Sequence, residues 1–387
     1  MESLPMPLPE NACEGEFALS DGLIHLNHAG VSPWPRRTAE AVKAFAEENV
    51  ACGSLHYDRW LRVEHELREQ LRVLLNAPSA GDIALVKNTS EALSFVAAGL
   101  EWRSGDNIVT ADEEFPSNRI VWEALADRGV ELREAAIGRS ADPEAALFSG
   151  VDSRTRLIAV SSVQFGSGLR MDLRRIGEFC RDRGILFCVD AIQSIGAVRF
   201  DVRDSGADFA MADGHKWMLG PEGLGVFYSR PEAREMLRLT EYGWHMVERA
   251  GAFDERQWVP ASSARRFECG SPNMIGIHAL HASLSLLLDV GMDHVERLLL
   301  ERTAWLQDRL NSLVGVELVT PTLPGRFAGI VTFRTRTDPA RLYQSLSEGG
   351  VLCAPRSGGI RFSPHFHTPP AHLEGAVDLV SRCLSQG

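Results

Sequence analysis

Two short stretches, ILFCVDAIQ at residues 185–193 and FAMADGHKW at residues 209–217, decide the predicted fold of this chain. Each begins with apolar residues typical of a buried strand and ends in polar side chains, a carboxylate at Asp190 and an amine at Lys216. The interval between the two polar residues is about one strand–crossover–strand unit. Because ligands collect at the carboxyl ends of parallel strands, we expect Asp190 and Lys216 to lie close together.

The same alternation of short apolar strands and helices extends outward from these stretches. It predicts a mainly parallel sheet that is covered by helices on both faces. Upstream, residues 36–76 have strong helical periodicity, and a helix is expected to begin near residue 89. The expected strands are 107–110, 157–161, 185–189, 209–212 and 225–228, and the expected helices between them are 118–127 and 173–183.

The pattern changes near residue 250, which predicts a second domain. Helices at 278–288 and 293–313 are followed by short strands at 316–319 and 330–334, a helix at 339–348 and a last helix from Pro370. We therefore expect a large domain over residues 26–250 and a smaller α+β domain over residues 251–387. The N-terminal segment, residues 1–25, is expected to pack near the smaller domain. The boundary is uncertain by about 20 residues, since boundaries are the weakest part of sequence-based assignment.

Composition excludes several classes of protein. The chain has 387 residues, of which 44% are hydrophobic, and a formal net charge of −12. That acidic balance argues against nucleic acid and anionic membranes as partners. The seven cysteines are scattered without a C-x-x-C pair, so no metal site is expected. No signal-peptide pattern or run of about 20 apolar residues is present, which favours a cytoplasmic protein.

A buried lysine opposite a carboxylate is what pyridoxal-phosphate (PLP) chemistry requires. The lysine amine bonds covalently to the cofactor aldehyde, and burial or nearby positive charge keeps part of it neutral. The carboxylate keeps the pyridine nitrogen protonated, so that the ring can accept electrons. Alone, Asp190 would read as a helix cap and Lys216 as a solvated loop residue. Together, at this spacing, they favour a PLP site.

The segment from Val189 to Ser229 resembles the cofactor-binding core of class V aminotransferases. This fold-type I PLP family includes cysteine desulfurases and isopenicillin-N-epimerase-like enzymes. The motifs that carry the resemblance are Asp-x-x-Gln from residue 190, Gly-His-Lys at 214–216 and Gly-Pro-x-Gly at 220–223. The likeness extends from LNHAG at 26–30 to RFSP at 361–364. It implies a large domain with a mainly parallel seven-stranded sheet, a smaller α+β C-terminal domain, and a homodimer with shared active sites.

The resemblance also implies roles for individual residues that bind the cofactor. Lys216 matches the lysine that bonds to PLP, and Asp190 matches the partner of the pyridine nitrogen. The other matching positions are Gln193 for the phenolic oxygen, Phe115 for stacking on the ring, Thr89, Ser90 and His215 for the phosphate, and Ser271 for the phosphate of a neighbouring subunit. The Thr89–Ser90 turn is also favoured on physical grounds, because a helix N-terminus attracts anions. An ordinary helix cap, a core phenylalanine and a plain turn are the structural alternatives.

On the substrate side, Arg361 matches the arginine that binds the substrate carboxylate. A guanidinium suits that task because it can bind two oxygens at once. Arg356 is a weaker second candidate in a Pro- and Gly-rich loop. Asn27 and His28 are candidates for lining the substrate pocket, with a purely structural role equally open.

Three positions depart from the pattern of cysteine desulfurases. Cys353 ends an apolar strand and residues 354–361 contain no cysteine, so a relay of sulfur through a protein persulfide is not expected. Asp213 stands where those enzymes commonly carry a hydroxyl near the phosphate. A carboxylate there would be repelled, so we expect Asp213 to point elsewhere or to contact His215. Ser162 replaces a polar amide, and we expect Gln164 to take over its role beside the substrate.

These features predict a PLP-dependent enzyme that acts at the α-carbon of a small amino-acid substrate. We favour β-elimination, as in a C–S lyase, without a persulfide cysteine. Epimerisation and transamination are the alternatives. A nicotinamide-dependent dehydrogenase is disfavoured because the chain lacks the GxGxxG fingerprint. A non-catalytic relative is disfavoured because Lys216, Asp190 and Arg361 are all present.

Overall fold

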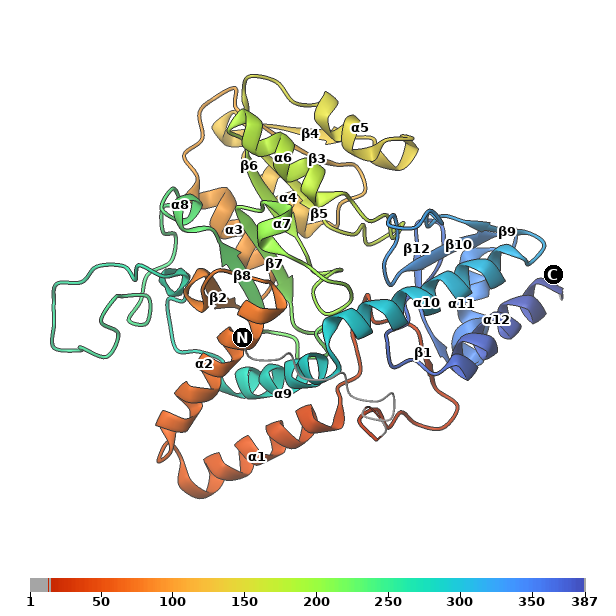
Figure 1. Cartoon of the computed structure of the whole chain (residues 1–387), viewed down its shortest axis with the longest axis horizontal. Helices are drawn as coiled ribbons and strands as arrows, with labels where there is room; N and C mark the ends of the chain where they lie inside the picture. Colours follow the sequence, from red (N-terminus) through yellow and green to blue (C-terminus); the bar gives the residue numbers. More distant parts are fainter. Residues whose placement is uncertain (1–12, 14, 386–387) are drawn as a thin grey trace.

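A seven-stranded sheet forms the centre of the computed structural model, which describes residues 13 and 15–385 (Figure 1). The strand order is β2-β8-β7-β6-β5-β3-β4. Strand β8 runs antiparallel to β2 and β7, and the other neighbouring pairs are parallel, which confirms the predicted fold class. The strands are β2 (Ile83–Val86), β3 (Asn107–Ala111), β4 (Glu131–Ala135), β5 (Thr155–Ser161), β6 (Leu186–Asp190), β7 (Phe209–Asp213) and β8 (Gly225–Ser229).

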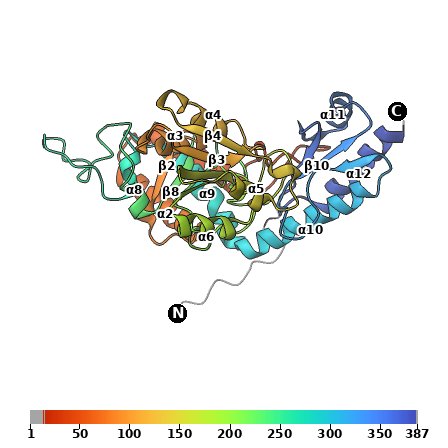
Figure 2. The same cartoon turned by 90° about the horizontal axis from the view of Figure 1, so that it is seen from above.

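Helices cover both faces of this sheet. Figure 2 shows α3 and α4 on one side and α2 and α6 on the other. The first four residues of β6 are apolar because both faces of the strand are buried: Phe187 and Val189 pack into one core cluster, and Leu186 and Cys188 pack into the other. The helices of this part are α1 (Arg36–Cys52), α2 (Tyr57–Leu74), α3 (Thr89–Gly99), α4 (Ser117–Glu123), α5 (Pro143–Ser149), α6 (Leu173–Arg183), α7 (Val202–Ser205), α8 (Pro231–Arg234) and α9 (Met274–Val290).

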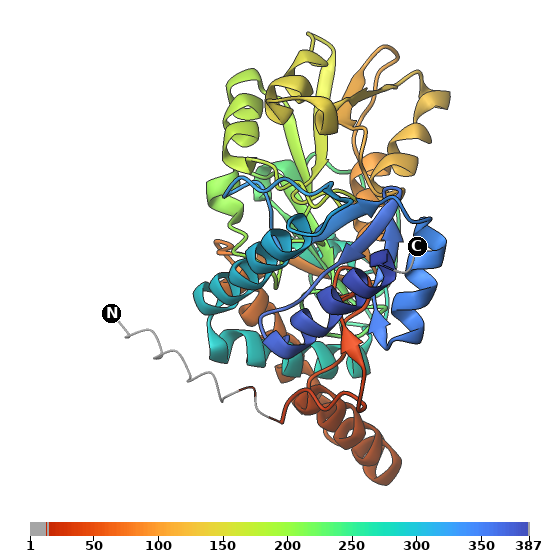
Figure 3. The same cartoon turned by 90° about the vertical axis from the view of Figure 1, so that its right-hand side faces the viewer.

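A smaller α+β part lies beside the large sheet (Figure 1) and faces the viewer in Figure 3. Its four-stranded antiparallel sheet has the order β12-β13-β10-β9, and β1 pairs in parallel with β11. Helix α10 leads from the large part into the smaller one (Figure 1). The elements are β1 (Ile24–His25), β9 (Val316–Leu318), β10 (Val331–Thr335), β11 (Val351–Leu352), β12 (Ala354–Arg356), β13 (Gly359–Phe362), α10 (Met292–Asn311), α11 (Pro339–Glu348) and α12 (Pro370–Ser385).

Two contacts bear on how the chain divides between the parts. Leu26 belongs to the same core cluster as Phe333 and Phe362, so the chain around β1 packs with the C-terminal elements. Helix α9 packs against α1 and α2, although it follows residue 250. The expected bounds at residues 26, 250 and 251 stay predictions. For the N-terminal segment, residues 1–12 and 14 lie outside the described residues.

The connection between α8 and α9 extends away from the body of the molecule (Figures 1 and 2). Its exposed side chains include Tyr242, Phe253 and Trp258. We call residues 240–262 the arm. Within the described part of the chain, no single helix combines the length and apolarity needed to cross a membrane, although α9 and α10, which meet at a bend of 83°, reach both together.

Candidate active site

Asp190 and Lys216 lie at the carboxyl ends of two neighbouring parallel strands. Asp190 is the last residue of β6 and pairs with Met211 of β7, and Lys216 follows β7 by three residues. The amine of Lys216 points to the ring of Phe115, with Nζ 5.6 Å from the ring centroid. Three of the residues assigned to the cofactor from sequence are thus brought together by the sheet.

The local electrostatics moves the pKa values of Asp190 and Lys216 toward each other. Burial raises the pKa of Asp190, the Ile192 N–H group lowers it, and the charge of Glu114 raises it again. Burial lowers the pKa of Lys216, Asp190 opposes this shift, and the positive charge of Arg361 reinforces it. A lysine with a lowered pKa has more of the neutral amine that covalent chemistry with an aldehyde needs.

The predicted phosphate residues lie around the first turn of α3. Asn88 caps the helix by accepting a hydrogen bond from the Glu91 N–H group at 2.9 Å. The Thr89 N–H group donates to Oδ1 of Asp213 at 2.7 Å, and the other carboxylate oxygen is 3.7 Å from Nδ1 of His215. Asp213 therefore contacts His215 and also lies directly on the expected phosphate turn.

Ser90 lies next to Thr89 and points to a different element. Its hydroxyl donates to the Ser117 hydroxyl at 2.8 Å, at the start of α4. The phosphate role assigned to Ser90 from sequence stays a prediction. Ser117 had no sequence signal beyond following Phe115 and Pro116.

Gln193 is held by Trp217, a residue to which we assigned no role from sequence. The indole Nε1 of Trp217 donates to Oε1 of Gln193 at 2.7 Å, and Nε2 of Gln193 donates to the Ala29 carbonyl at 3.2 Å. On the backbone of the same residue, the Trp217 carbonyl lies 3.0 Å from Nε2 of His365. Because Nδ1 of His365 accepts the Phe366 N–H group, Nε2 carries the proton and donates to Trp217.

Arg361 on β13 is a buried guanidinium without a carboxylate partner among residues 15–385. Its Nη1 donates to the Phe165 carbonyl at 2.9 Å and its Nη2 to Oδ1 of Asn27 at 3.3 Å. Its Nε has no hydrogen-bond partner within the same residues. Burial, followed by the positive charge of Arg356, lowers the pKa of Arg361 to about 9. A buried positive charge without a carboxylate partner attracts an anion that enters the site, because the anion compensates that charge.

Arg356 lies on the hairpin that carries Arg361. Strands β12 and β13 pair Ala354 with Arg361, and the turn consists of Ser357 and Gly358, both with positive φ (49° and 73°). Two such residues in succession form the tight turn that suits the strand twist. Arg356 is exposed and donates to the Pro355 carbonyl at 2.7 Å. Its charge acts on Arg361 and Lys216, so the hairpin tip faces the site.

Cys353 lies directly before β12 and is buried among apolar residues of the smaller core. Burial raises the pKa of its thiol to about 12, and the charge of Arg361 only partly opposes this. The thiol is therefore protonated at neutral pH, and a protonated thiol is a poor nucleophile.

Gln164 is held by Glu114, a buried carboxylate that we did not single out from sequence. Glu114 accepts from Nε2 of Gln164 at 2.9 Å, from the Ser161 N–H group at 2.7 Å and from Nδ2 of Asn118 at 2.8 Å. Burial raises the pKa of Glu114, and these donors oppose the rise. The Oε1 atom of Gln164 is buried and has no partner in the described part of the chain. The only sequence signal for Glu114 was its position next to Phe115.

His28 belongs to a cluster with the buried His25 and His365 and the partly buried His367. Its Nδ1 donates to the Ser363 carbonyl at 2.8 Å, and its Nε2 lies 3.2 Å from Nε2 of His367. Both ring nitrogens are therefore engaged by protein groups. Of the pair Asn27 and His28, it is Asn27 that contacts Arg361.

Ser271 is exposed and precedes α9. It lines a cleft of about 260 Å³ together with Lys87, Glu91 and Cys269, and this cleft does not include Lys216. Glu91, which lines the same cleft, belongs to the first turn of α3, and the expected role of Ser271 toward a neighbouring subunit stays a prediction.

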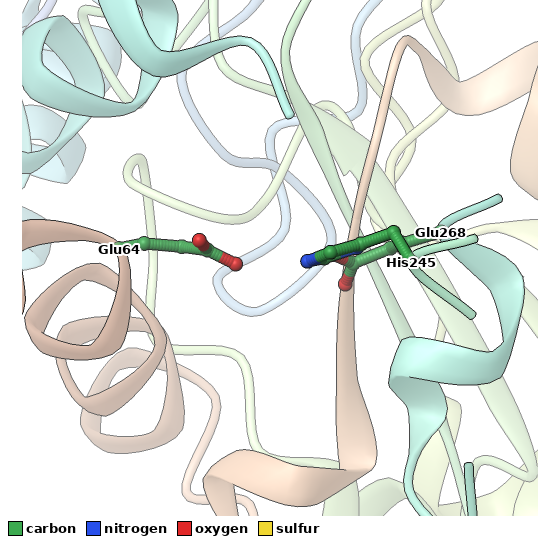
Figure 4. A group of neighbouring side chains, drawn as sticks. All are labelled: Glu64, His245 and Glu268. Atoms are coloured by element: carbon green, nitrogen blue, oxygen red, sulfur yellow. The ribbon is translucent and has the colours of Figure 1, made fainter. Parts of the chain in front are cut away.

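A second group of ionisable side chains lies close enough together to bind a metal ion, but its carboxylates are already paired with an arginine. Glu64 on α2, His245 in the arm and Glu268 face one another (Figure 4). Arg68 already donates to Glu64 at 2.6 Å and to both oxygens of Glu268 at 2.7 and 2.8 Å. Burial disfavours its charge, but the two carboxylates raise the pKa of Arg68. This group is an ion-pair network that ties α2 to the base of the arm.

Comparisons with known proteins agree with this geometry. The model of the family described as Aminotransferase class-V matches residues 24–360. A probable cysteine desulfurase of Methanothermobacter thermautotrophicus is 33% identical over 87% of this chain and 84% of its own length. An isopenicillin N epimerase of Streptomyces clavuligerus is 29% identical over 95% and 96% of the two chains. The apo structure of a cysteine desulfurase from Thermococcus onnurineus NA1 superimposes with a TM-score of 0.89 over 100% of both chains, at 23% identity.

Proposed function

The chain belongs to the class V aminotransferase family of PLP-dependent enzymes, and on this premise we propose that it eliminates a β-substituent from a cysteine-like amino acid. The family accounts for the cofactor and for chemistry on amino acids. The proposal adds the type of reaction, the residues that perform it and the absence of a protein persulfide.

The residues around Lys216 fit PLP. The phosphate would be held near Thr89, Ser90 and His215, the ring would stack on Phe115, and Asp190 would face the ring nitrogen. The fit is supported by the lowered pKa of the buried Lys216, whose amine points to the Phe115 ring. When bound, the cofactor supplies an aldehyde that bonds to an amine and a ring that accepts electrons from the substrate α-carbon.

The observation that carries the substrate class is the uncompensated guanidinium of Arg361. A buried positive charge with a free Nε donor is stabilised by a carboxylate, and planar two-point binding fits a guanidinium best. Asn27 holds one side of this guanidinium through Oδ1. An α-amino acid offers such a carboxylate next to the carbon where Lys216 acts.

The chain's own residues then have separate tasks. Arg361 orients the substrate through its carboxylate, and Lys216 removes the proton from the α-carbon with its neutral Nζ. Asp190 keeps a proton on the ring nitrogen. Gln164 offers the buried Oε1 as an acceptor for a substrate N–H or S–H group, while Glu114 fixes its Nε2.

Elimination without a persulfide on the protein is supported by Cys353. The thiol is buried, and its raised pKa makes it unreactive. The sulfur eliminated from the β-carbon would therefore be released as a separate reduced product rather than bond to this residue. Epimerisation would instead return a proton to the α-carbon from the opposite side, and transamination would retain the amino group on the enzyme.

A screen of amino acids with a Lys216→Ala control tests the proposal. We expect purified protein to show a visible absorption band that shifts when a cysteine-like amino acid is added, with release of pyruvate, ammonia and a reduced sulfur product. Lys216→Ala should lose both the band and turnover. A change in chirality or formation of a 2-oxo acid with retained sulfur would favour the alternatives, and normal turnover of Lys216→Ala would refute the role of Lys216.

We also propose a cytoplasmic homodimer. Support for the dimer comes from the exposed aromatic side chains of the arm and from Ser271, which is exposed near the end of the same connection and lines a cleft that does not include Lys216. Support for a reducing compartment comes from the seven unpaired cysteines. Light scattering after size exclusion measures the mass, and a monomer that retains full activity would overturn the shared site.

A further inference from the structure

We infer that Asp213 is an internal anion that competes with the cofactor phosphate for the first turn of α3, so that phosphate binding is coupled to uptake of a proton by Asp213. This inference rests on the proposed function, because it concerns the same site. It names a residue that controls how the pH sets cofactor affinity.

The geometry places the Asp213 carboxylate on the groups that would serve a phosphate. Its Oδ1 accepts the Thr89 N–H group at 2.7 Å, and its Oδ2 lies 3.7 Å from the ring of His215. The Glu91 N–H group of the same turn is already bonded to Asn88. A carboxylate from β7 thus uses a helix N-terminal donor that would otherwise attract an external anion.

The surroundings of Asp213 allow its charge to change near neutral pH. Burial raises its pKa to about 6, the Thr89 N–H group and Lys216 oppose this rise, and Glu222 adds to it. Burial, followed by the charge of Lys216, lowers the pKa of the neighbouring His215 to about 4. The imidazole is therefore neutral above pH 5 and does not offset the charge of Asp213.

The direction of the coupling follows from these charges. Above pH 6 Asp213 is anionic in the free protein and repels the phosphate dianion. Binding of the phosphate then requires one proton from solvent on the carboxyl group, which leaves a neutral group that still lies beside Thr89. The contribution of the phosphate to affinity should fall by up to about tenfold for each pH unit above 6, because one proton is taken up per phosphate bound.

Paired titrations with PLP and pyridoxal isolate this contribution. Both aldehydes react with Lys216, but only PLP carries the phosphate, so the ratio of their dissociation constants at each pH removes the effect of the lysine. We expect the advantage of PLP to shrink between pH 6 and pH 8 in the unaltered protein. In Asp213→Asn, which keeps an acceptor for the Thr89 N–H group, the advantage should be at least about tenfold larger at pH 8 and nearly constant with pH.

Controls keep the inference separate from the proposed function. Glu222→Gln removes a nearby charge but keeps Asp213, so the slope of the pH dependence should remain while its onset moves to a lower pH. Asp213→Ser serves as a second variant if Asp213→Asn does not fold. Inorganic phosphate, titrated by calorimetry in buffers of different ionisation enthalpy, reports proton uptake without any reaction at Lys216. Failure of both aldehydes to bind would refute the proposed function, whereas equal affinity of the unaltered protein and Asp213→Asn for phosphate would overturn the inference.

Discussion

The indole N–H group of Trp217 donates a hydrogen bond to Oε1 of Gln193 across 2.7 Å, and both side chains are buried. This bond fixes the orientation of the Gln193 amide, because its oxygen is used by Trp217. One N–H of the amide is bonded to the Ala29 carbonyl, and the second is left to donate to a ligand. Trp217 thereby links the residue after Lys216 to the amide expected to bind the phenolic oxygen.

Removal of the indole donor should therefore affect both stability and the cofactor. Trp217→Phe leaves a buried acceptor on Gln193 without its partner, which costs about 1–3 kcal/mol of unfolding free energy. The released amide can turn, so the pH at which the visible band of the bound cofactor titrates should also move. Urea unfolding and a spectroscopic pH titration measure the two effects. Trp305→Phe, at a partly buried position on α10, is the matched control and should change neither.

Replacement of Arg361 by lysine should weaken substrate binding more than catalysis. Lysine keeps one positive charge but loses the planar fork that can bind two carboxylate oxygens. We expect Arg361→Lys to raise KM for the amino acid by at least about tenfold, with a smaller change in kcat, as for an interaction made already in the ground state. Arg336→Lys, at an exposed position just beyond strand β10, should leave both constants unchanged. An unaltered KM in Arg361→Lys would contradict the carboxylate role.

The ion-pair network of Arg68 should contribute strongly to stability. Glu268→Gln removes one of the two carboxylates that compensate the buried guanidinium, which should cost about 3–5 kcal/mol. Asp58→Asn breaks the exposed pair between Asp58 and Arg62 on the same helix and should lower the stability much less than Glu268→Gln. Denaturant unfolding of the two variants compares them directly. Similar losses would show that Glu268 does not hold the base of the arm as described.

Acid should destabilise the fold through the buried histidines. Burial lowers the pKa of His25 to about 4 and that of His365 to about 3, below the ordinary value of 6.5. The unfolded chain therefore binds more protons below pH 6.5, and stability falls as the pH drops through 6.5 toward these values. Each such histidine costs about 2 kcal/mol between pH 7 and pH 5.

A variant without one of these imidazoles tests the effect. His25→Gln should reduce the loss of unfolding free energy between pH 7 and pH 5, measured by urea unfolding at both values. His65→Gln, at an exposed position on α2, should leave the loss unchanged. Equal acid sensitivity of all three proteins would rule out the cluster as its source.

Cys353 should be dispensable for turnover. Its thiol is buried and protonated, so Cys353→Ala is expected to keep the rate of sulfur release within about twofold and to lose about 1 kcal/mol of stability for the small cavity. Steady-state assays of folded protein, checked by circular dichroism, measure this. Loss of sulfur release in folded Cys353→Ala would mean that the thiol does reach the substrate.

The local pattern of apolar and polar residues was sufficient to predict the bounds of several helices and strands. Helices α6 and α11 have the bounds expected from their periodicity, and the buried strands β5 to β8 lie within one or two residues of their apolar runs. Strand β4 was missed because Glu131, Arg133 and Glu134 are charged, so this edge strand lacks both an apolar run and a regular alternation. Helix α4 ends at Glu123 rather than at the expected residue 127, because a short 3-10 turn follows it.

The sequence alone determined that Asp190 and Lys216 share one edge of the sheet, because the carboxyl ends of parallel strands meet and the spacing allows one crossover. Tertiary structure alone decided which hydrogen-bond partners the polar side chains have. Asp213 reaches the N–H group of Thr89, and Arg361 reaches the carbonyl of Phe165, across 124 and 196 residues of chain. Contacts over such distances depend on how whole elements pack and on which buried groups remain without partners. A local pattern of residue types predicts neither.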